Sequence, residues 1–225
     1  MNKTLPGARF VASYSGGKDS VLAIHRAIRS GMKLEALLIT YNTDRGRSWF
    51  HGIPENVLEQ ISQSIGVPIR LIRTSGQDYT EKFEKALKLE QQNGVQACVF
   101  GDIDIAGHLE WGTQRCEATG LQACFPLWNE DRRKLTEECI RSGFRPTVTV
   151  VDTRRLDASF AGRPLTMETV HQMEQAGIDP CGENGEYHSF VNDGPIFSSP
   201  VPVTFEPVIV MNGYAITPIV LKTEP

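Results

Sequence analysis

Six consecutive residues near the start of the chain have the composition of a phosphate-binding loop. This segment, called the phosphate loop below, reads Ser15-Gly16-Gly17-Lys18-Asp19-Ser20. An apolar run, Arg9–Tyr14, precedes it and an amphipathic run, Val21–Ser30, follows it. This order predicts a strand, a glycine-rich turn and a helix, which brings free backbone N–H groups and the positive end of a helix dipole to one point. The sequence therefore predicts a site for a phosphate-bearing ligand.

The residue types of the phosphate loop indicate how phosphates would be held. The two glycines allow the backbone to approach phosphate oxygens, the two serines offer hydroxyl donors, and Lys18 supplies a positive charge. Asp19 would repel a phosphate on its own, so it predicts a bridging Mg²⁺. Because Lys18 directly follows the Gly-Gly pair, the loop is neither a Walker A motif nor a dinucleotide fingerprint.

A second stretch, Gly182–Val191, is called the polar segment below. Its polar side chains are those of Glu183, Asn184, Glu186, Tyr187, His188 and Ser189. Two carboxylates and a histidine this close together fit a site that holds a polar substrate or a metal, or that takes a proton from an attacking amine. The alternative is a solvated hairpin whose charges have no chemical role.

Other candidate residues follow the predicted strands. Thr40 and Tyr41 end the second strand and are candidates to flank an adenine ring. His51 lies in the loop that follows. We expect it either to contact a ligand or to cap the next helix. Asp102 ends the fourth strand, where it binds Mg²⁺ or an incoming amine, or serves as a helix N-cap.

Strands and helices alternate through the first two thirds of the chain. The predicted strands are Arg9–Tyr14, Leu34–Tyr41, Pro68–Thr74, Ala97–Gly101, Gln122–Phe125 and Thr147–Val151. The predicted helices are Ser20–Ser30, Pro54–Ile65, Tyr79–Asn93, Gly107–Thr119 and Asp131–Ser142. The glycines that follow these helices, as left-handed C′ residues should, are Gly31, Gly66, Gly94, Gly120 and Gly143.

This alternation predicts an α/β fold, with a doubly wound, mostly parallel sheet of five to six strands. Ligands of such sheets bind beyond the carboxyl ends of the strands, near the point where the strand order reverses. After residue 152 the pattern changes to one helix, Thr166–Ala176, and short β-like runs. We therefore expect a ligand-binding domain over residues 1–152 and a small α+β lobe over residues 153–225. The runs are Val201–Phe205, Pro207–Met211 and Ile216–Leu221.

Composition limits the possible partners. The 225 residues carry a net charge of −4, which provides no broad basic field and argues against a nucleic-acid partner. No apolar stretch approaches the ~20 residues that span a membrane, and the first residues lack the apolar core of a signal peptide. We expect a cytoplasmic protein without a membrane partner. The five cysteines show no Cys-x-x-Cys spacing, which argues against a disulfide framework or a zinc knuckle.

The phosphate loop resembles the pyrophosphate loop of the N-type ATP pyrophosphatases, whose fold is of the adenine nucleotide α-hydrolase-like (HUP) type. Four further motifs resemble the diphthine–ammonia ligase family over about residues 8–200. They are Gly-Asp-Ile at 101–103, Pro-Leu-Trp at 126–128, Gly-Phe at 143–144 and Gly-Glu-Asn-Gly-Glu-Tyr at 182–187. The resemblance implies a ligase that uses ATP and Mg²⁺, adenylates a carboxylate and releases AMP and pyrophosphate when ammonia attacks.

The resemblance and the residue types together assign expected roles. ATP would be bound by the phosphate loop with Thr40 and Tyr41, and the metal by Asp19 and Asp102. The expected catalytic residues are Lys18, Asp19, Asp102, Glu183, Glu186 and His188. The expected acceptor-binding residues are His51, Glu183, Asn184, Glu186 and Ser189. Because no glutaminase domain fits this length, ammonia would be free or would come from a partner.

Four alternatives remain open at this level. Asn184 and His188 depart from the family pattern and resemble a bacterial branch linked to cobalamin-related metabolism, so the acceptor could be a small acid rather than protein-borne diphthine. Sulfur transfer to a tRNA base would use Cys181. A nucleotide sensor would bind ATP without turnover. The apolar C-terminal strands offer a surface for a homodimer.

Overall fold

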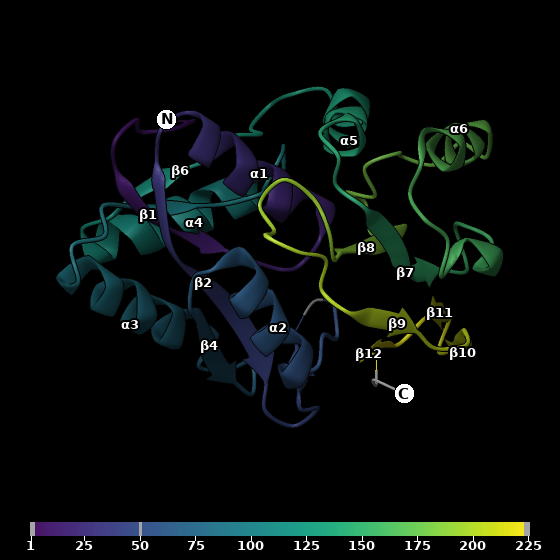
Figure 1. Ribbon diagram of the computed structural model, residues 1–225, viewed down its shortest axis with the longest axis horizontal. Coiled ribbons are helices and arrows are strands. Elements are labelled where there is room, and N and C mark those ends of the chain that lie inside the picture. Colours follow the sequence, from purple (N-terminus) through teal and green to yellow (C-terminus); the bar gives the residue numbers. More distant parts are fainter. Residues whose placement is uncertain (1–2, 50, 223–225) are drawn as a thin grey trace.

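The computed structural model describes residues 3–49 and 51–222, which form two larger sheets and a two-stranded ribbon, with helices packed around them (Figure 1). The first sheet contains β1 (Arg9–Ser13), β2 (Lys33–Asn42), β3 (Arg47–Ser48), β4 (Ile69–Thr74), β5 (Ala97–Val99) and β6 (Gln122–Cys124). The helices between and after these strands are α1 (Lys18–Arg29), α2 (Glu55–Ile65), α3 (Tyr79–Gln92), α4 (Ala106–Thr119) and α5 (Arg132–Arg141).

The first sheet has the order β4-β2-β1-β5-β6, with these five strands parallel. The short β3 pairs antiparallel with the end of β2. Helices α1 and α2 pack on one face, through Leu22 and Leu58, and α3 and α4 on the other, through Leu87 and Cys116. The strand order reverses between β1 and β5, so the phosphate loop after β1 and Asp102 after β5 meet at the switch point.

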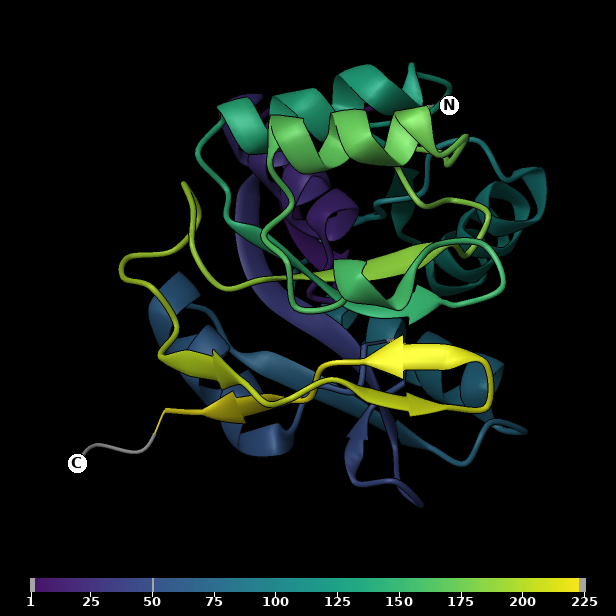
Figure 2. The ribbon, with the colours of Figure 1, turned by 90° about the vertical axis from the view of Figure 1, so that its right-hand side faces the viewer.

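A second, antiparallel sheet has the order β10-β11-β7-β8. Its strands are β7 (Pro146–Asp152), β8 (Tyr187–Val191), β10 (Ile209–Met211) and β11 (Tyr214–Ile216). A separate ribbon pairs β9 (Val203–Phe205) with β12 (Ile219–Leu221). A 3₁₀ turn, η1 (Ala158–Phe160), and α6 (Met167–Gln175) complete this part of the chain. Figure 2 shows α5 and α6 side by side, joined by the 2.9 Å contact of Arg133 Nε with Glu174 Oε1.

The two sheets are joined at the phosphate loop. The backbone N–H of Val191, at the end of β8, donates to the carbonyl of Gly16 at 2.9 Å. Phe190 is fully buried in the core that α1 and α2 share with β8. Gly16 has φ +87°, and a Cβ there would lie 2.5 Å from Ile53 Cδ1, so only glycine fits this contact. The polar segment is therefore fixed against the phosphate loop by packing and a backbone hydrogen bond.

The structure confirms the α/β class and the mostly parallel sheet. The five glycines predicted to end helices all have positive φ, between +78° at Gly120 and +95° at Gly143. β3 and β8 were not predicted as strands, and two of the predicted strands differ from the sequence-based expectation. β7 joins the second sheet, because its partners are the antiparallel β8 and β11. The run Ile216–Leu221 divides into β11 and β12, because Thr217 N bonds Thr149 O at 2.9 Å and Pro218 has no N–H.

None of the helices among residues 3–49 and 51–222 is long and apolar enough to cross a bilayer.

Phe190→Ala should lower the free energy of unfolding by roughly 3–5 kcal/mol, because it empties a fully buried site where β8 meets the phosphate loop. Val210→Ala is the matched control, since Val210 is 63% exposed and should change stability by no more than about 0.5 kcal/mol. Urea unfolding of both variants tests this. A loss for Phe190→Ala as small as that of the control would contradict the packing described.

Candidate active site

A cavity of about 500 Å³ lies at the switch point between β1 and β5. The phosphate loop forms its floor, and the loop after β5 and the first turns of α3 and α4 form one side. Residues of the polar segment, with Cys181 before it, form another part of the wall. Residues from both predicted motifs thus face one space, although more than 160 positions separate Lys18 from Glu183 in the chain.

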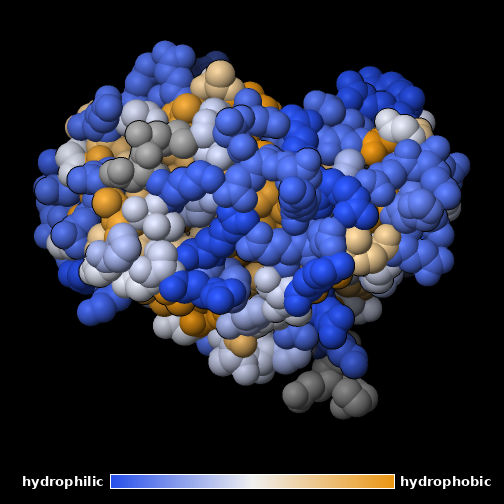
Figure 3. All heavy atoms as spheres, turned by 90° about the horizontal axis from the view of Figure 1, so that it is seen from above, coloured by the Kyte–Doolittle hydropathy of each residue, from blue (hydrophilic) through white to orange (hydrophobic). Residues whose placement is uncertain are grey.

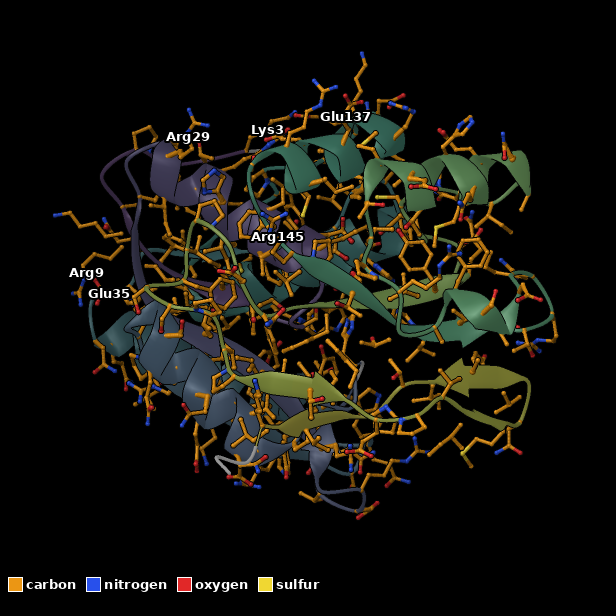
Figure 4. The ribbon with its side chains drawn as sticks, turned by 45° about the vertical axis from the view of Figure 1, so that its right-hand side comes forward. Lys3, Arg9, Arg29, Glu35, Glu137 and Arg145 are labelled. Atoms are coloured by element: carbon orange, nitrogen blue, oxygen red, sulfur yellow. The ribbon has the colours of Figure 1, made fainter. Side chains whose placement is uncertain are left out.

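A second depression, of about 540 Å³, lies away from these loops between α1 and α5. It is lined by charged and polar side chains, among them Arg29 and Glu137, which Figure 4 labels at the outer surface. Glu137 is paired there with Arg141 and Arg133. The face seen in Figure 3 is mostly hydrophilic. We regard this depression as an open charged surface and not as a reaction site.

The ammonium group of Lys18 is buried and paired. Its Nζ lies 2.7 Å from Asp19 Oδ2, donates to the backbone carbonyl of Cys181, and lies 5.7 Å from the centre of the Tyr187 ring. Burial is the largest single influence and lowers the pKa of Lys18, but the interactions with Asp19, Cys181 and Tyr187 together outweigh it and hold that pKa well above its ordinary value. Lys18 is therefore a fixed positive charge that connects the phosphate loop to the start of the polar segment.

Hydroxyl oxygens accept hydrogen bonds from two backbone N–H groups of the phosphate loop. Gly17 N donates to Ser15 Oγ at 3.2 Å and Lys18 N donates to Ser189 Oγ at 3.3 Å. Because both bonds are long, phosphate oxygens could replace these hydroxyl oxygens as the acceptors. A Cβ on Gly17 would lie 2.9 Å from His51 Cε1, and a Cβ on Gly101 would lie 2.8 Å from Ser20 N. Glycine at position 17 lets His51 approach the phosphate loop, and glycine at position 101 lets the loop after β5 approach it.

Three side chains form the group best placed to hold a cation. One ligand atom from each of Asp19, Cys181 and Glu183 lies within 4.8 Å of the others. Burial raises the pKa of the Cys181 thiol to about 12, so the thiol is neutral and a poor ligand for Mg²⁺. The two carboxylates fit Mg²⁺, which takes one or two carboxylates together with phosphate oxygens. Asp102, the second predicted metal ligand, lies outside this group.

Burial controls the protonation of the other titratable groups. It raises the pKa of Glu183 to about 7, with a further contribution from Asp19. Burial and the nearby His188 lower the pKa of His51 to about 3, and its Nδ1 is buried without a hydrogen-bond partner. Burial and Lys18 also lower the pKa of His188. At neutral pH the two histidines are thus uncharged, and Glu183 is close to its midpoint.

Ten of the predicted site residues line the cavity. They are Ser15, Gly17, Lys18, Asp19, Ser20, His51, Asp102, Glu183, His188 and Ser189. Their individual roles stay predictions, since position alone does not assign them. Cys181 also faces the cavity.

The other predicted residues lie outside the lining for identifiable reasons. Thr40 and Tyr41 are buried because β3 and the following loop cover the end of β2, with Trp49 N donating to Thr40 O at 2.9 Å. Gly16 packs against Ile53 and Phe190. The buried Glu186 carboxylate accepts hydrogen bonds from Asn184 N and Nδ2, both at 3.1 Å, and so closes the turn rather than facing the cavity.

Sequence reasoning missed the side of the cavity formed by α3 and α4. Tyr79 and Trp111 stack there with ring centres 5.2 Å apart, and the buried Phe100 lies beside them. His108 Nδ1 lies 2.9 Å from Asp102 Oδ1, which raises the pKa of His108. One signal was available: His108 and Trp111 are three residues apart on a helix and share a face. Nothing in the sequence showed that this face turns toward the phosphate loop.

Comparison with known families gives two matches along the chain. Residues 8–123 match the profile described as the diphthamide synthase N-terminal domain, and residues 131–212 match the diphthamide synthase C-terminal domain.

Curated relatives are similar over nearly the whole chain. Proteins named diphthine–ammonia ligase from Bos taurus and Danio rerio are 24% and 22% identical to it. Each alignment covers 94% of this chain, with 88% of the bovine and 92% of the zebrafish protein. A solved chain described as a predicted subunit of tRNA methyltransferase from Methanocaldococcus jannaschii aligns at 14% identity with a TM-score of 0.44, covering 84% of this chain and 98% of its own length.

The raised pKa of Glu183 gives a testable dependence of stability on pH. Between pH 4.5 and about 7 the folded state binds this proton more tightly than the unfolded state does. The contribution of Glu183 to stability is therefore present below about pH 4.5 and is lost as the pH rises through about 7. Glu183→Gln should gain stability relative to the native protein across this window, measured by urea unfolding with a chelator present. A difference that does not change with pH would contradict the assignment.

Proposed function

Because the chain belongs to the diphthamide synthase family, we propose that it is an ATP-dependent ligase that joins ammonia to a carboxylate acceptor of the diphthine type. The curated relatives are named for this reaction, and they align over most of their own length as well as over most of this chain. The support therefore covers the phosphate loop and the polar segment together.

One structural observation supports the proposal independently of the similarity to the relatives. The phosphate loop and the polar segment line a single cavity, in which ligand atoms of Asp19 and Glu183 lie within 4.8 Å of each other. A ligation driven by ATP requires an acceptor carboxylate to reach a phosphorus atom, so the nucleotide site and the acceptor site must adjoin. A nucleotide sensor would not need a carboxylate with a pKa of about 7 beside its phosphate loop.

We propose that the reaction takes two steps. An oxygen of the acceptor carboxylate attacks the α-phosphorus of ATP, the bond to the bridging oxygen breaks, and pyrophosphate leaves. Ammonia then attacks the acyl carbon, the bond to AMP breaks, and one proton is released. The backbone N–H groups of Gly17 and Lys18 bind phosphate oxygens, and the Lys18 charge stabilises the negative charge that moves onto pyrophosphate. Mg²⁺ on Asp19 and Glu183 would supply further charge neutralisation when bound.

The polar segment would receive the acceptor. Ser189 and the uncharged His51 and His188 face the cavity, where they can donate or accept hydrogen bonds without repelling an anionic acceptor. The Asp102–His108 pair, which also lines the cavity, is a candidate to take the proton released by the attacking amine. The names of the relatives favour diphthine over a small acid. Sulfur transfer gains no support, because the Cys181 thiol is neutral.

The direct test is the fate of ATP. With ammonium, Mg²⁺ and a diphthine-bearing acceptor protein, the chain should convert ATP to AMP and pyrophosphate, with one amide formed for each AMP. Phosphorus NMR of the reaction mixture identifies the products, and omission of the acceptor is the control. Formation of ADP and phosphate, or turnover that ignores the acceptor, would contradict the proposal.

Lys18→Gln should reduce kcat/KM for ATP by about 100-fold or more, because it removes the fixed charge at the phosphate loop. Lys134→Gln removes an exposed lysine on α5 and should leave the rate unchanged. Because Lys18 is buried, circular dichroism and urea unfolding must show that the variant is folded at the assay temperature. A folded Lys18→Gln protein with native kcat/KM would rule out this role.

A further inference from the structure

Arg132, the first residue of α5, binds side chains from two loops that both contribute residues to the lining of the cavity. Its Nε and Nη2 donate to the two carboxylate oxygens of Asp104 at 2.6 and 2.7 Å. Its Nη1 donates to Asp179 Oδ2 and, at 3.4 Å, to Asn184 Oδ1. One guanidinium thus joins the loop after β5, the start of α5 and the segment that enters β8.

Each partner of Arg132 lies next to a residue of the candidate active site. Asp104 follows Asp102 by two positions, and Asn184 directly follows Glu183. Asp179 uses its second oxygen to accept from Cys181 N at 2.9 Å, and the carbonyl of Cys181 accepts from Lys18 Nζ. Arg132 itself does not line the cavity among the residues described. It therefore acts on the site only through the loops that it holds.

We propose that Arg132 is a positioning residue that fixes the spacing between the Asp102 loop and the Glu183 loop, and so the distance over which acceptor, amine and phosphate must meet. The catalytic part of this inference rests on the proposed ligase function. A planar guanidinium with donors on two sides suits this task, because it can bind one carboxylate through two parallel bonds and still reach a second.

The neighbouring arginine shows why this arrangement is more than a surface ion pair. Arg133 also binds two carboxylates, Glu137 on its own helix and Glu174 on α6, but neither lies near the cavity. Its side chain is 46% exposed, against 27% for Arg132. The bond to Arg132 lowers the pKa of Asp104, so that carboxylate remains ionised and the contact persists at neutral pH.

The test compares Arg132→Gln with Arg133→Gln, which removes the same charge one position further along α5. Arg132→Gln should speed hydrogen exchange of backbone amides over residues 179–186, because the segment loses its charged contact with α5 and keeps only the 3.2 Å bond from Thr136 Oγ1 to the carbonyl of Pro180. It should also lower kcat for AMP formation about tenfold or more, since a shift of about 1 Å in an active site has effects of this size. The Kd for ATP, measured by calorimetry, should rise by a smaller factor than kcat falls, because Lys18 keeps its ion pair with Asp19 inside the phosphate loop. Arg133→Gln should change none of these quantities.

Two further variants separate positioning from folding. Arg132→Lys keeps the charge but cannot bind Asp104 through two parallel bonds and reach Asp179 together, so its kcat and exchange rates should lie between those of the native protein and Arg132→Gln. Asp104→Asn weakens only the contact between Arg132 and the loop after β5. Added to Arg132→Gln it should cause no further loss of kcat, because both changes break the same contact. If Arg132→Gln fails to fold, these two single variants carry the same comparison.

The outcomes distinguish this inference from the proposed function. If the native protein forms no AMP with any acceptor, the ligase proposal fails. Faster hydrogen exchange over residues 179–186 in Arg132→Gln would still support the role of Arg132 in holding the two loops together. If AMP forms and Arg132→Gln matches Arg133→Gln in both exchange and kcat, the positioning role is wrong. An increase in the Kd for ATP as large as the loss of kcat would also overturn it, because the damage would then lie in the phosphate loop rather than in the spacing of the two loops.

Discussion

The arrangement of the site depends on the burial of one charge. A lysine ammonium that is almost fully removed from water must be paired, and Lys18 is paired with Asp19 from its own loop and with the carbonyl of Cys181 from across the molecule. That requirement brings the segment before β8 onto the phosphate loop. The Val191–Gly16 backbone bond and the packing of Phe190 hold it there. The two halves of the chain thus share a site because Lys18 has polar partners in both of them.

The close packing of charged groups around Lys18 also determines the protonation of the cavity lining. Asp19, Glu183 and Asp102 bring three carboxylates to a space with one buried ammonium, so burial and repulsion shift the pKa of Glu183 to about 7. Such a surface favours a divalent cation and phosphates over a phosphate group alone. The uncharged histidines and the stacked Tyr79 and Trp111 complete the lining with groups that can contact a substrate without adding charge.

Local signals were enough to predict the phosphate loop, the helix ends and the parallel sheet, because a glycine at a left-handed C′ position or a strand–turn–helix pattern depends on a few adjacent residues. Contacts between distant segments were not predictable in this way. The burial of Thr40 and Tyr41 follows from the hairpin with β3, and the inward turn of Glu186 from its bonds to Asn184. The Arg132 contacts join three segments, and no spacing in the sequence indicates them.

In the proposed reaction, ATP and the acceptor meet between the phosphate loop and the polar segment. A crystal structure with Mg²⁺ and an ATP analogue that resists cleavage between the α and β phosphates would locate the phosphates directly. We expect the β and γ phosphates on the backbone of Ser15–Ser20 and the α-phosphate facing Glu183. Phosphates bound elsewhere, or an α-phosphate turned away from the polar segment, would contradict this proposal.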